Sequence, residues 1–320
     1  MPAFDYPLET LKKYTGINPR PDDFDAYWTE ALRELESIEP EAELIPDKTL
    51  GIHNAECFGL TFTGIGGARI YAKYTRPKGK QGCPAVLRFH GYAGHSGDWS
   101  EQLMFTSEGM CVAGMDCRGQ GGLSEDNGVV KGTTMRGHFV RGLGDPDPRK
   151  LLFRSIFLDT VQLARVVASF EEVDENRMGA TGASQGGALA IACAALEPRI
   201  KQVVAAHPFL CDYRRVWDLD LAKDAYQELR TFFRWHDPLH EREEEIFTHL
   251  GYIDIQHLAP RVQAKTLMLV SLMDTVCPPS TQFCVYNKMT CDKSMKIYSD
   301  YEHEFLPGMN DHILRGMLQL

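Results

Sequence analysis

The sequence predicts an α/β protein with a mostly parallel central sheet covered by helices on both faces. Three observations support this: short apolar runs recur along the 320 residues, helix-like stretches separate several of them, and 43% of the residues are hydrophobic. Strands that are apolar throughout are typical of a sheet buried on both sides, and alternation with helices favours parallel pairing. Because no internal repeat or low-complexity linker divides the chain, we expect one domain over residues 1–320.

Each element follows from a local pattern. "PDDFDAYWTEALRELESI" opens with Pro and Asp and then spaces its apolar residues as on one helix face. "AECFGLTFTGIGGARIYAKYTRP" predicts two strands around a Gly-rich turn. The expected buried strands are "PAVLRFHG", "MCVAGMDCRG", "RMGATGAS", "KQVVAAHPFL", "KTLMLVSLMD" and "SMKIYSDYEHE", and two of the expected helices are "FRSIFLDTVQLARVVASF" and "GGALAIACAAL".

Two stretches interrupt this alternation. Residues 121–150 are polar and Gly-rich, and residues 211–260 are charged and aromatic with helical patterns. We interpret both as insertions between sheet elements, the first after an "RGQ" motif and the second after a "PFL" strand end, and not as separate domains. Insertions at such loop positions often shape a pocket or form a subunit contact.

Composition argues against several classes of partner. The formal net charge of −10 is unsuited to binding nucleic acid or an anionic membrane surface. We find no run long enough to span a membrane and no export signal in the first residues. Nine scattered cysteines without a C-x-x-C pair indicate free thiols. We therefore expect a cytoplasmic protein with no nucleic-acid or membrane partner.

The segment "GASQG", residues 182–186, places a serine between glycines where an apolar strand passes into a helix. This G-x-S-x-G pattern in a strand–turn–helix context is typical of a nucleophile elbow, in which Ser184 would be the nucleophile. The glycines allow strand and helix to approach closely, and the helix N-terminus adds partial positive charge. The alternative is a plain helix cap, because serine is a common N-cap residue.

The order of residues downstream favours the nucleophile. Hydrolases with such an elbow run serine, then acid, then histidine. The apolar strand "TLMLVSLMD" ends at Asp274, and "MKIYSDYEHE" ends a strand just before His303. We therefore predict a catalytic triad of Ser184, Asp274 and His303, in which the histidine takes the serine proton and the aspartate fixes its tautomer.

Other residues could take these roles. Asp254 and Asp300 are alternative acids, but neither closes a buried apolar strand. His312 is an alternative base, but it falls inside the last helical pattern.

Acyl transfer also needs hydrogen-bond donors for the developing oxyanion. The first should be the backbone N–H of Gln185, directly after the nucleophile, and the second should come from the loop after an earlier strand. That loop is "LRFHGYAGHSGDW", and the backbone N–H of Tyr92 is the expected donor, with His90 and Gly91 forming the bend.

The motif "DCRGQGGLS" contains Arg118 and Gln120, which we expect to support the structure. Arg118 should pair with a buried carboxylate, and Glu304 beside His303 is our first candidate. We predict no metal and no cofactor. Asp145 and Asp147 in "GDPDP" fit a rigid turn better than a metal site, and four histidines lack the spacing of zinc ligands, namely His90, His95, His138 and His207.

With these residues in place, the chain resembles the acetyl xylan esterase and cephalosporin C deacetylase group, carbohydrate esterase family seven of the α/β-hydrolase superfamily. The resemblance covers nearly the whole chain. It rests on "LKKYTGINPRPDDFDAYW", "FHGY", "RGQ", "GASQGG", "HPFLCDYRR", "DTVCPPST" and the "HE" of His303 and Glu304.

The resemblance implies an α/β-hydrolase fold and a serine esterase that removes acetyl groups. The implied substrates are acetylated xylo-oligosaccharides, small acetylated sugars and cephalosporin C. The family triad corresponds to Ser184, Asp274 and His303, and its oxyanion donors to Tyr92 and Gln185. Similar members are intracellular and often assemble as hexamers, so a homo-oligomer is expected. Three departures stand out. After the first insertion the chain reads "DPDPRKLLFR" where an aromatic-rich stretch is expected. His207 precedes "PFL" where an apolar residue is expected, and Glu302 precedes "HE" where a glycine is expected.

An acetyl-specific site needs bulky residues beside the nucleophile. We expect Tyr92, Phe209 and Tyr213 to form the walls of this pocket, although each could equally serve ordinary core packing. The alternative functions are a broader carboxylesterase or peptidase on the same fold, and a non-catalytic interaction protein, which would usually have lost a triad member.

Overall fold

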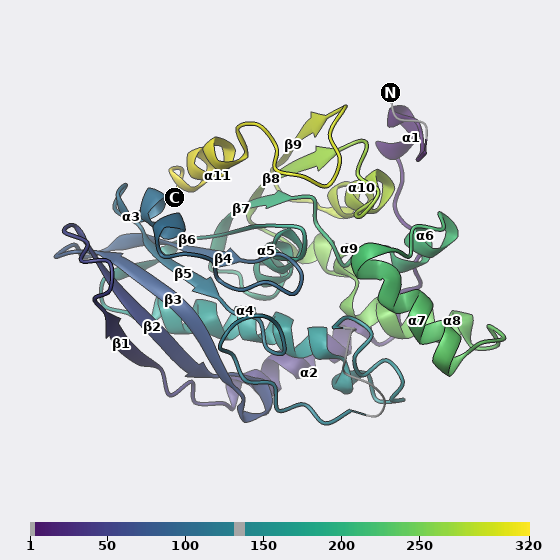
Figure 1. The fold of residues 1–320 in the computed structure, drawn as a ribbon, viewed down its shortest axis with the longest axis horizontal. Helices are drawn as coiled ribbons and strands as arrows, with labels where there is room; N and C mark the ends of the chain where they lie inside the picture. Colours follow the sequence, from purple (N-terminus) through teal and green to yellow (C-terminus); the bar gives the residue numbers. More distant parts are fainter. Residues whose placement is uncertain (1–3, 131–137) are drawn as a thin grey trace.

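The computed structural model describes residues 4–130 and 138–320, and a single nine-stranded sheet forms its centre (Figure 1). The strand order is β1-β2-β3-β5-β4-β6-β7-β8-β9. The strands are β1 (Glu43–Asp47), β2 (Ala55–Thr63), β3 (Arg69–Pro77), β4 (Cys83–Phe89), β5 (Cys111–Met115), β6 (Val173–Ala183), β7 (Ile200–Ala206), β8 (Lys265–Ser271) and β9 (Lys293–Tyr298).

The sheet has an antiparallel beginning and a parallel remainder. β1, β2, β3 and β5 pair antiparallel in that order, and every pair from β5 through β4, β6, β7 and β8 to β9 is parallel. This confirms the predicted α/β-hydrolase fold class with a mostly parallel sheet. Sequence analysis missed β1, an edge strand that contains Pro46 and is largely exposed.

Alternate residues of the buried strands point to opposite faces of the sheet. In β4, Ala85, Leu87 and Phe89 join the larger core cluster, whereas Val86 joins a second cluster on the other side. The larger cluster includes residues of α2 (Phe24–Glu36), α4 (Leu152–Ala168), α5 (Gln185–Leu196) and α10 (Pro279–Lys288). The second includes residues of α3 (Ser100–Thr106) and α11 (Met309–Met317). Helices therefore cover both faces, as predicted.

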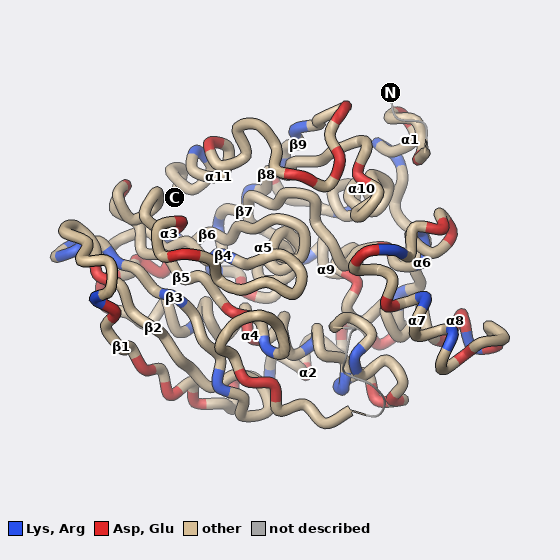
Figure 2. The backbone as a smooth tube through the Cα atoms, in the orientation of Figure 1, with Lys and Arg blue, Asp and Glu red and all other residues tan. Residues whose placement is uncertain are grey.

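Helix α5 follows the predicted nucleophile and lies in the middle of the larger cluster. It carries no charged residue (Figure 2). All its residues except Ala195 are buried. The charged residues of the chain lie mainly on the surrounding loops, edge strands and outer helices (Figure 2). A helix that is apolar on every side can be stable only inside the protein, so α5 gives the residue before it a rigid base.

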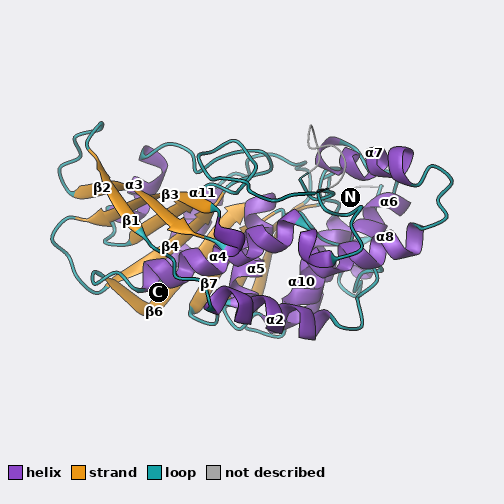
Figure 3. Ribbon diagram, turned by 90° about the horizontal axis from the view of Figure 1, so that it is seen from below, coloured by secondary structure: helices purple, strands orange, loops and turns teal. Residues whose placement is uncertain are grey.

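The two stretches interpreted as insertions differ in structure. In the described part of residues 121–150 the only helix is a short 3-10 turn at Pro148–Lys150, while residues 131–137 lie outside the described residues. The second stretch holds α6 (Tyr213–Asp218), α7 (Gln227–His236), α8 (Glu243–Leu250) and α9 (Ile255–Leu258). Figure 3 shows α6, α7 and α8 grouped beyond one end of the sheet.

Buried carboxylates join the start of this helical stretch to the rest of the molecule. Asp212 accepts hydrogen bonds from the Tyr14 hydroxyl at 2.7 Å and from the Asn18 N–H at 2.8 Å. Asp254 in turn accepts from the Asp212 N–H at 2.9 Å and caps α9 through the Gln256 N–H. The N-terminal segment and the helical stretch are thereby held together.

Candidate active site

Ser184 stands at the sharp turn between β6 and α5. Its backbone has φ 57° and ψ −121°, a conformation that residues other than glycine seldom adopt. The Ser184 N–H donates to the Ala206 carbonyl at 2.9 Å, and the Phe209 N–H donates to the Ser184 carbonyl at 3.1 Å. These bonds fix the strained turn to the end of β7, as a nucleophile elbow requires.

The flanking glycines make this turn possible. A methyl group at Gly182 would lie 2.5 Å from the Phe89 carbonyl oxygen, and one at Gly186 would overlap the same atom. The end of β4 therefore packs directly against the backbone of the elbow. Any larger side chain at either glycine would push the strand and the helix apart.

The structure brings the three predicted triad side chains together. His303 Nε2 lies 3.0 Å from Ser184 Oγ, and His303 Nδ1 lies 2.8 Å from Asp274 Oδ2. Because an ionised carboxylate only accepts, the Nδ1 proton of neutral His303 faces Asp274, and Nε2 is free to accept the serine proton. Asp274 is fully buried, and its other oxygen accepts from the N–H groups of Val276 and Cys277 at 2.9 and 2.7 Å.

The alternative acids and base lie elsewhere. Asp254 is buried at the start of α9 and bonded to Asp212 and Gln256. Asp300 is exposed in the loop before His303, and His312 lies within α11.

The two expected oxyanion donors, in the loop after β4 and at the first residue of α5, are linked by one side-chain pair. Gln120 Oε1 accepts from the Ala93 N–H at 2.9 Å, and the amide groups of Gln120 and Gln185 contact each other at 2.9 and 3.1 Å. In the part of the chain that the structure describes, the N–H groups of Tyr92 and Gln185 donate to no protein acceptor. Gln120 thus links the Tyr92 loop to the residue after Ser184.

The Tyr92 side chain points into the helical stretch. Its hydroxyl donates to Glu228 Oε1 on α7 and accepts from the His138 N–H at 3.0 Å. Glu228 was not foreseen, because nothing in its local sequence marks it. Burial raises the pKa of Glu228 to about 7, while its hydrogen bond from Tyr92 opposes the rise. His138, α7 and the predicted oxyanion loop therefore meet at the half-buried side chain of Glu228.

The expected pairing of Arg118 with Glu304 is wrong. Arg118 binds Asp159 of α4 through two hydrogen bonds of 2.6 Å, and both side chains are almost fully buried. Glu304 is exposed, and its side chain instead accepts from the Glu302 N–H at 3.1 Å. The signal for Asp159 was available: a carboxylate in the middle of an apolar helical pattern needs a buried cation.

A cavity of about 1380 Å³ lies above Ser184 and His303. Its walls come from residues 88–97, at the end of β4 and in the loop after it, from His138 and Val140, and from α7, including Glu228, Phe232 and Trp235. Tyr92 lines the cavity as expected. Phe209 and Tyr213 do not line it, because both are fully buried: Phe209 packs against the Tyr92 ring, and Tyr213 packs against Phe139. Their position in the sequence, just after a strand end, predicted that they lie near the site, but it could not predict that their rings point away from the cavity.

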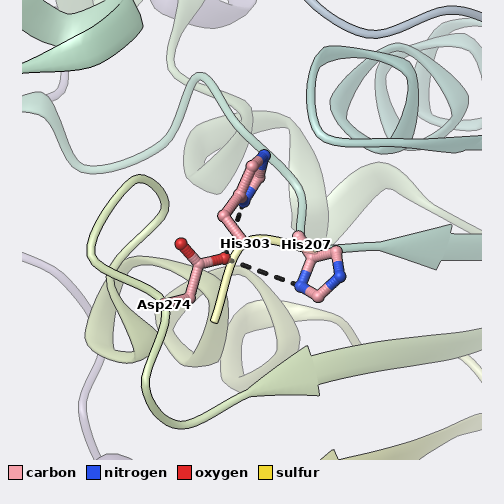
Figure 4. A group of neighbouring side chains, drawn as sticks. All are labelled: His207, Asp274 and His303. Carbon is pink, nitrogen blue, oxygen red and sulfur yellow. Dashed lines mark hydrogen bonds and ion pairs between the residues drawn. The ribbon is translucent and has the colours of Figure 1, made fainter. Parts of the chain in front are cut away.

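A second histidine lies beside the acid (Figure 4). His207, Asp274 and His303 each offer a ligand atom, and these atoms lie within 4.8 Å of one another. The distance of 2.8 Å between His303 and Asp274 is that of a hydrogen bond.

Asp145 and Asp147 form a turn, since the Asp147 N–H donates to Asp145 and Asp147 caps the following 3-10 helix. That the chain needs no metal or cofactor stays a prediction.

The family of this chain follows from its similarity to known proteins. The profile described as "Acetyl xylan esterase (AXE1)" matches residues 1–319. The chain belongs to the acetyl xylan esterase family. This is a family of carboxylic ester hydrolases, in agreement with the class of enzyme predicted from the motifs.

Two solved structures of the acetyl xylan esterase family resemble this chain along its whole length. One is acetyl xylan esterase 1 from Thermoanaerobacterium sp. JW/SL YS485, with a TM-score of 0.96 and 54% identity. The other is an acetyl xylan esterase from Paenibacillus sp. R4, with a TM-score of 0.94 and 33% identity. Each comparison covers 98% of this chain and 99% of the other chain.

Among curated proteins, the acetyl esterase Axe7A from Xylanibacter ruminicola is 27% identical over 301 residues, which is 92% of this chain. The chain spans 65% of the length of that relative. In the described residues, no helix is both long and apolar enough to cross a membrane.

The buried Arg118–Asp159 pair should dominate the stability of this region. Arg118→Met leaves the Asp159 carboxylate buried without a partner, and we expect a loss of about 3 to 5 kcal/mol in the free energy of unfolding, measured by urea denaturation. Arg33→Met, which removes an exposed arginine that pairs with Glu30 on α2, is the matched control and should leave the midpoint nearly unchanged. Equal effects of the two substitutions would contradict this assignment.

Glu228 should make stability fall as pH rises. The folded protein holds the Glu228 proton up to a pKa of about 7, whereas the unfolded chain releases it near pH 4.5. Between these values the folded state binds more protons, so the free energy of unfolding decreases with rising pH. Glu228→Gln removes this titration. The melting temperature of Glu228→Gln, relative to that of the wild type, should rise as the pH increases from 5 to 7.5. Parallel plots of melting temperature against pH for the two proteins would show that Glu228 titrates normally.

Proposed function

We propose that this chain is a serine esterase that removes acetyl groups from acetylated sugars and xylo-oligosaccharides through an acyl-enzyme. The observation that carries the proposal is the line of hydrogen bonds from Ser184 Oγ through His303 to Asp274, at 3.0 and 2.8 Å. Membership of the acetyl xylan esterase family supports the acetyl preference.

The proposed reaction begins with attack of Ser184 Oγ on the ester carbonyl. His303 Nε2 takes the serine proton as the bond forms, and the buried Asp274 carboxylate stabilises the imidazolium. His303 then gives this proton to the departing sugar hydroxyl. In the second half, His303 removes a proton from water as the water oxygen attacks the acetyl carbonyl. His303 then returns this proton to Ser184 Oγ as its bond to the acetyl group breaks, which releases acetate.

The negative charge that develops on the carbonyl oxygen must be stabilised both when the acyl-enzyme forms and when water hydrolyses it. The proposed donors are the backbone N–H groups of Tyr92 and Gln185, and the latter also stands at the N-terminus of α5. Each such donor typically contributes roughly 3 to 4 kcal/mol of transition-state stabilisation. We assign Gln120 and Arg118 to support of these loops, through Gln185 and Asp159 respectively.

The cavity is suited to a sugar as the alcohol part of the ester. It combines aromatic rings of Tyr92, Phe232 and Trp235 with hydrogen-bonding groups such as His138 and Glu228. Three relatives are named as acetyl or acetyl xylan esterases. Cephalosporin C, also an acetyl ester, is a further proposed substrate, and it rests on the resemblance alone.

A broader carboxylesterase is the second candidate. A cavity of about 1380 Å³ is far larger than an acetyl group requires, and Phe209 and Tyr213 do not narrow it. The space favours either a bulky alcohol or a long acyl chain, and only the first agrees with acetyl specificity.

We further propose a cytoplasmic homo-oligomer. All nine cysteines are unpaired in the structure, which agrees with a reducing compartment. Large apolar side chains are exposed in both insertions: Leu123, Val129, Trp235 and Leu239. Exposed apolar groups of this kind favour subunit contacts. A hexamer is the assembly that the family resemblance implies.

The triad assignment predicts a large loss of rate from a conservative change. Asp274→Asn should lower kcat by roughly 10⁴ because His303 would adopt the wrong tautomer, and Ser184→Ala should abolish turnover of p-nitrophenyl acetate. Asp300→Asn, a matched control in the loop before His303, should retain nearly full activity. A mild effect of Asp274→Asn, or retained activity in Ser184→Ala, would require a different acid or nucleophile.

Acyl-chain profiling separates the two candidate functions. With p-nitrophenyl esters of increasing chain length, we expect kcat/KM to be highest for acetate and to fall steeply towards octanoate. Comparable turnover of acetate and octanoate would favour the broader carboxylesterase. Rapid labelling of Ser184 by a fluorophosphonate is expected in either case, and its absence would favour a non-catalytic protein.

A further inference from the structure

We propose that His207 is a positioning residue that holds the loop carrying His303 against Asp274, in the neutral form with its proton on Nε2. The proposal rests on the esterase function above. His207 follows the last residue of β7, has a backbone φ of 43°, and is 3% exposed. Its ring lies beside that of His303, with the centroids 5.3 Å apart (Figure 4).

The hydrogen bonds of His207 decide which nitrogen carries the proton. Nε2 lies 3.1 Å from the carbonyl oxygen of Glu304, the residue after His303. A carbonyl oxygen can only accept, so Nε2 must donate. The His207 ring therefore ties the end of β7 to the backbone of the His303 loop.

The other nitrogen faces the end of β8. Nδ1 lies 3.4 Å from Ser271 Oγ and 3.5 Å from Asp274 Oδ2. In the neutral ring Nδ1 accepts, and Ser271 is the neighbour with a proton to donate. Protonated His207 would instead donate to Asp274 Oδ2, the same oxygen that accepts from His303 Nδ1. A neutral His207 thus leaves that oxygen to His303.

The surroundings favour the neutral ring. The titratable groups that face His207 are Asp274 from the loop after β8, and His303 and Glu304 from the loop after β9. Burial lowers the pKa of His207, and it outweighs the opposing attraction of Asp274. Through these hydrogen bonds, neutral His207 joins the end of β7 to Ser271 at the end of β8 and to Glu304 in the loop after β9.

This role explains why a buried polar residue stands where the family resemblance suggests an apolar one. Glu304 itself is exposed, and the bond from the Met273 N–H to the Tyr301 carbonyl, at 3.0 Å, holds the same loop two residues before His303. The His207 bond holds it on the other side of His303. Without the Nε2–H bond, the imidazole of His303 would be held at the end of a less constrained loop. Displacement of a catalytic group by about 1 Å can lower the rate roughly 10²-fold.

The test compares two substitutions of nearly equal length. His207→Gln keeps an N–H that can reach the Glu304 carbonyl, whereas His207→Met fills similar space without a donor. With p-nitrophenyl acetate, we expect His207→Met to lower kcat by about 10- to 100-fold with KM changed less than about twofold. His207→Gln should restore most of the lost kcat. Melting temperatures, measured alongside, show whether each variant is folded.

Several outcomes would overturn the proposal: kcat of His207→Met within about twofold of wild type, equal losses in the two variants, or a loss that appears in KM alone. Should both variants fail to fold, Ser271→Ala replaces them, because it removes only the donor to Nδ1. It should lower kcat by about fivefold at unchanged KM, as expected for one neutral hydrogen bond, and unchanged kcat would overturn the proposal. Wild-type protein that does not hydrolyse the ester would instead refute the esterase function.

Discussion

The burial of the Asp274 carboxylate is the constraint on which the rest of the site depends. A negative charge removed from water is costly unless every oxygen is satisfied. Here the backbone N–H groups of Val276 and Cys277 bind one oxygen, and His303 binds the other. The loop after β8 must therefore fold back on itself, and the loop after β9 must bring His303 to a single place. The position of Ser184 follows from the same arrangement.

Parallel pairing of the strands makes this convergence possible. The carboxyl ends of β4, β6, β7, β8 and β9 lie along one edge of the sheet, where ligand sites of open α/β sheets usually form. Each strand end contributes one part: the Tyr92 loop, Ser184, His207, Asp274 and His303. Because these parts belong to a single hydrogen-bonded sheet, their relative positions are set by strand register and not by flexible connections.

Much of this arrangement could be predicted from local sequence. Continuous apolar runs marked the buried strands, and the order of serine, aspartate and histidine at strand ends marked the residues that meet. β1 could not be found this way, because a short exposed edge strand with Pro46 has neither an apolar run nor regular alternation. The partner of Arg118 and the rings of Phe209 and Tyr213 were misjudged, since sequence distance says little about side-chain direction. Glu228 depends on where α7 docks, which only tertiary packing determines.

The cavity above Ser184 takes much of its wall from segments outside the sheet core. Residue 138, residue 140 and α7 all belong to the stretches between β5 and α4 or between β7 and β8. The side chains of the proposed triad sit on the strand ends beneath. In the proposed mechanism, leaving-group recognition and acyl transfer therefore depend on different segments of the chain. Evolution, or an engineer, can exchange the upper wall to alter which alcohols are accepted, provided that the contacts of Glu228 and His138 with Tyr92 are kept.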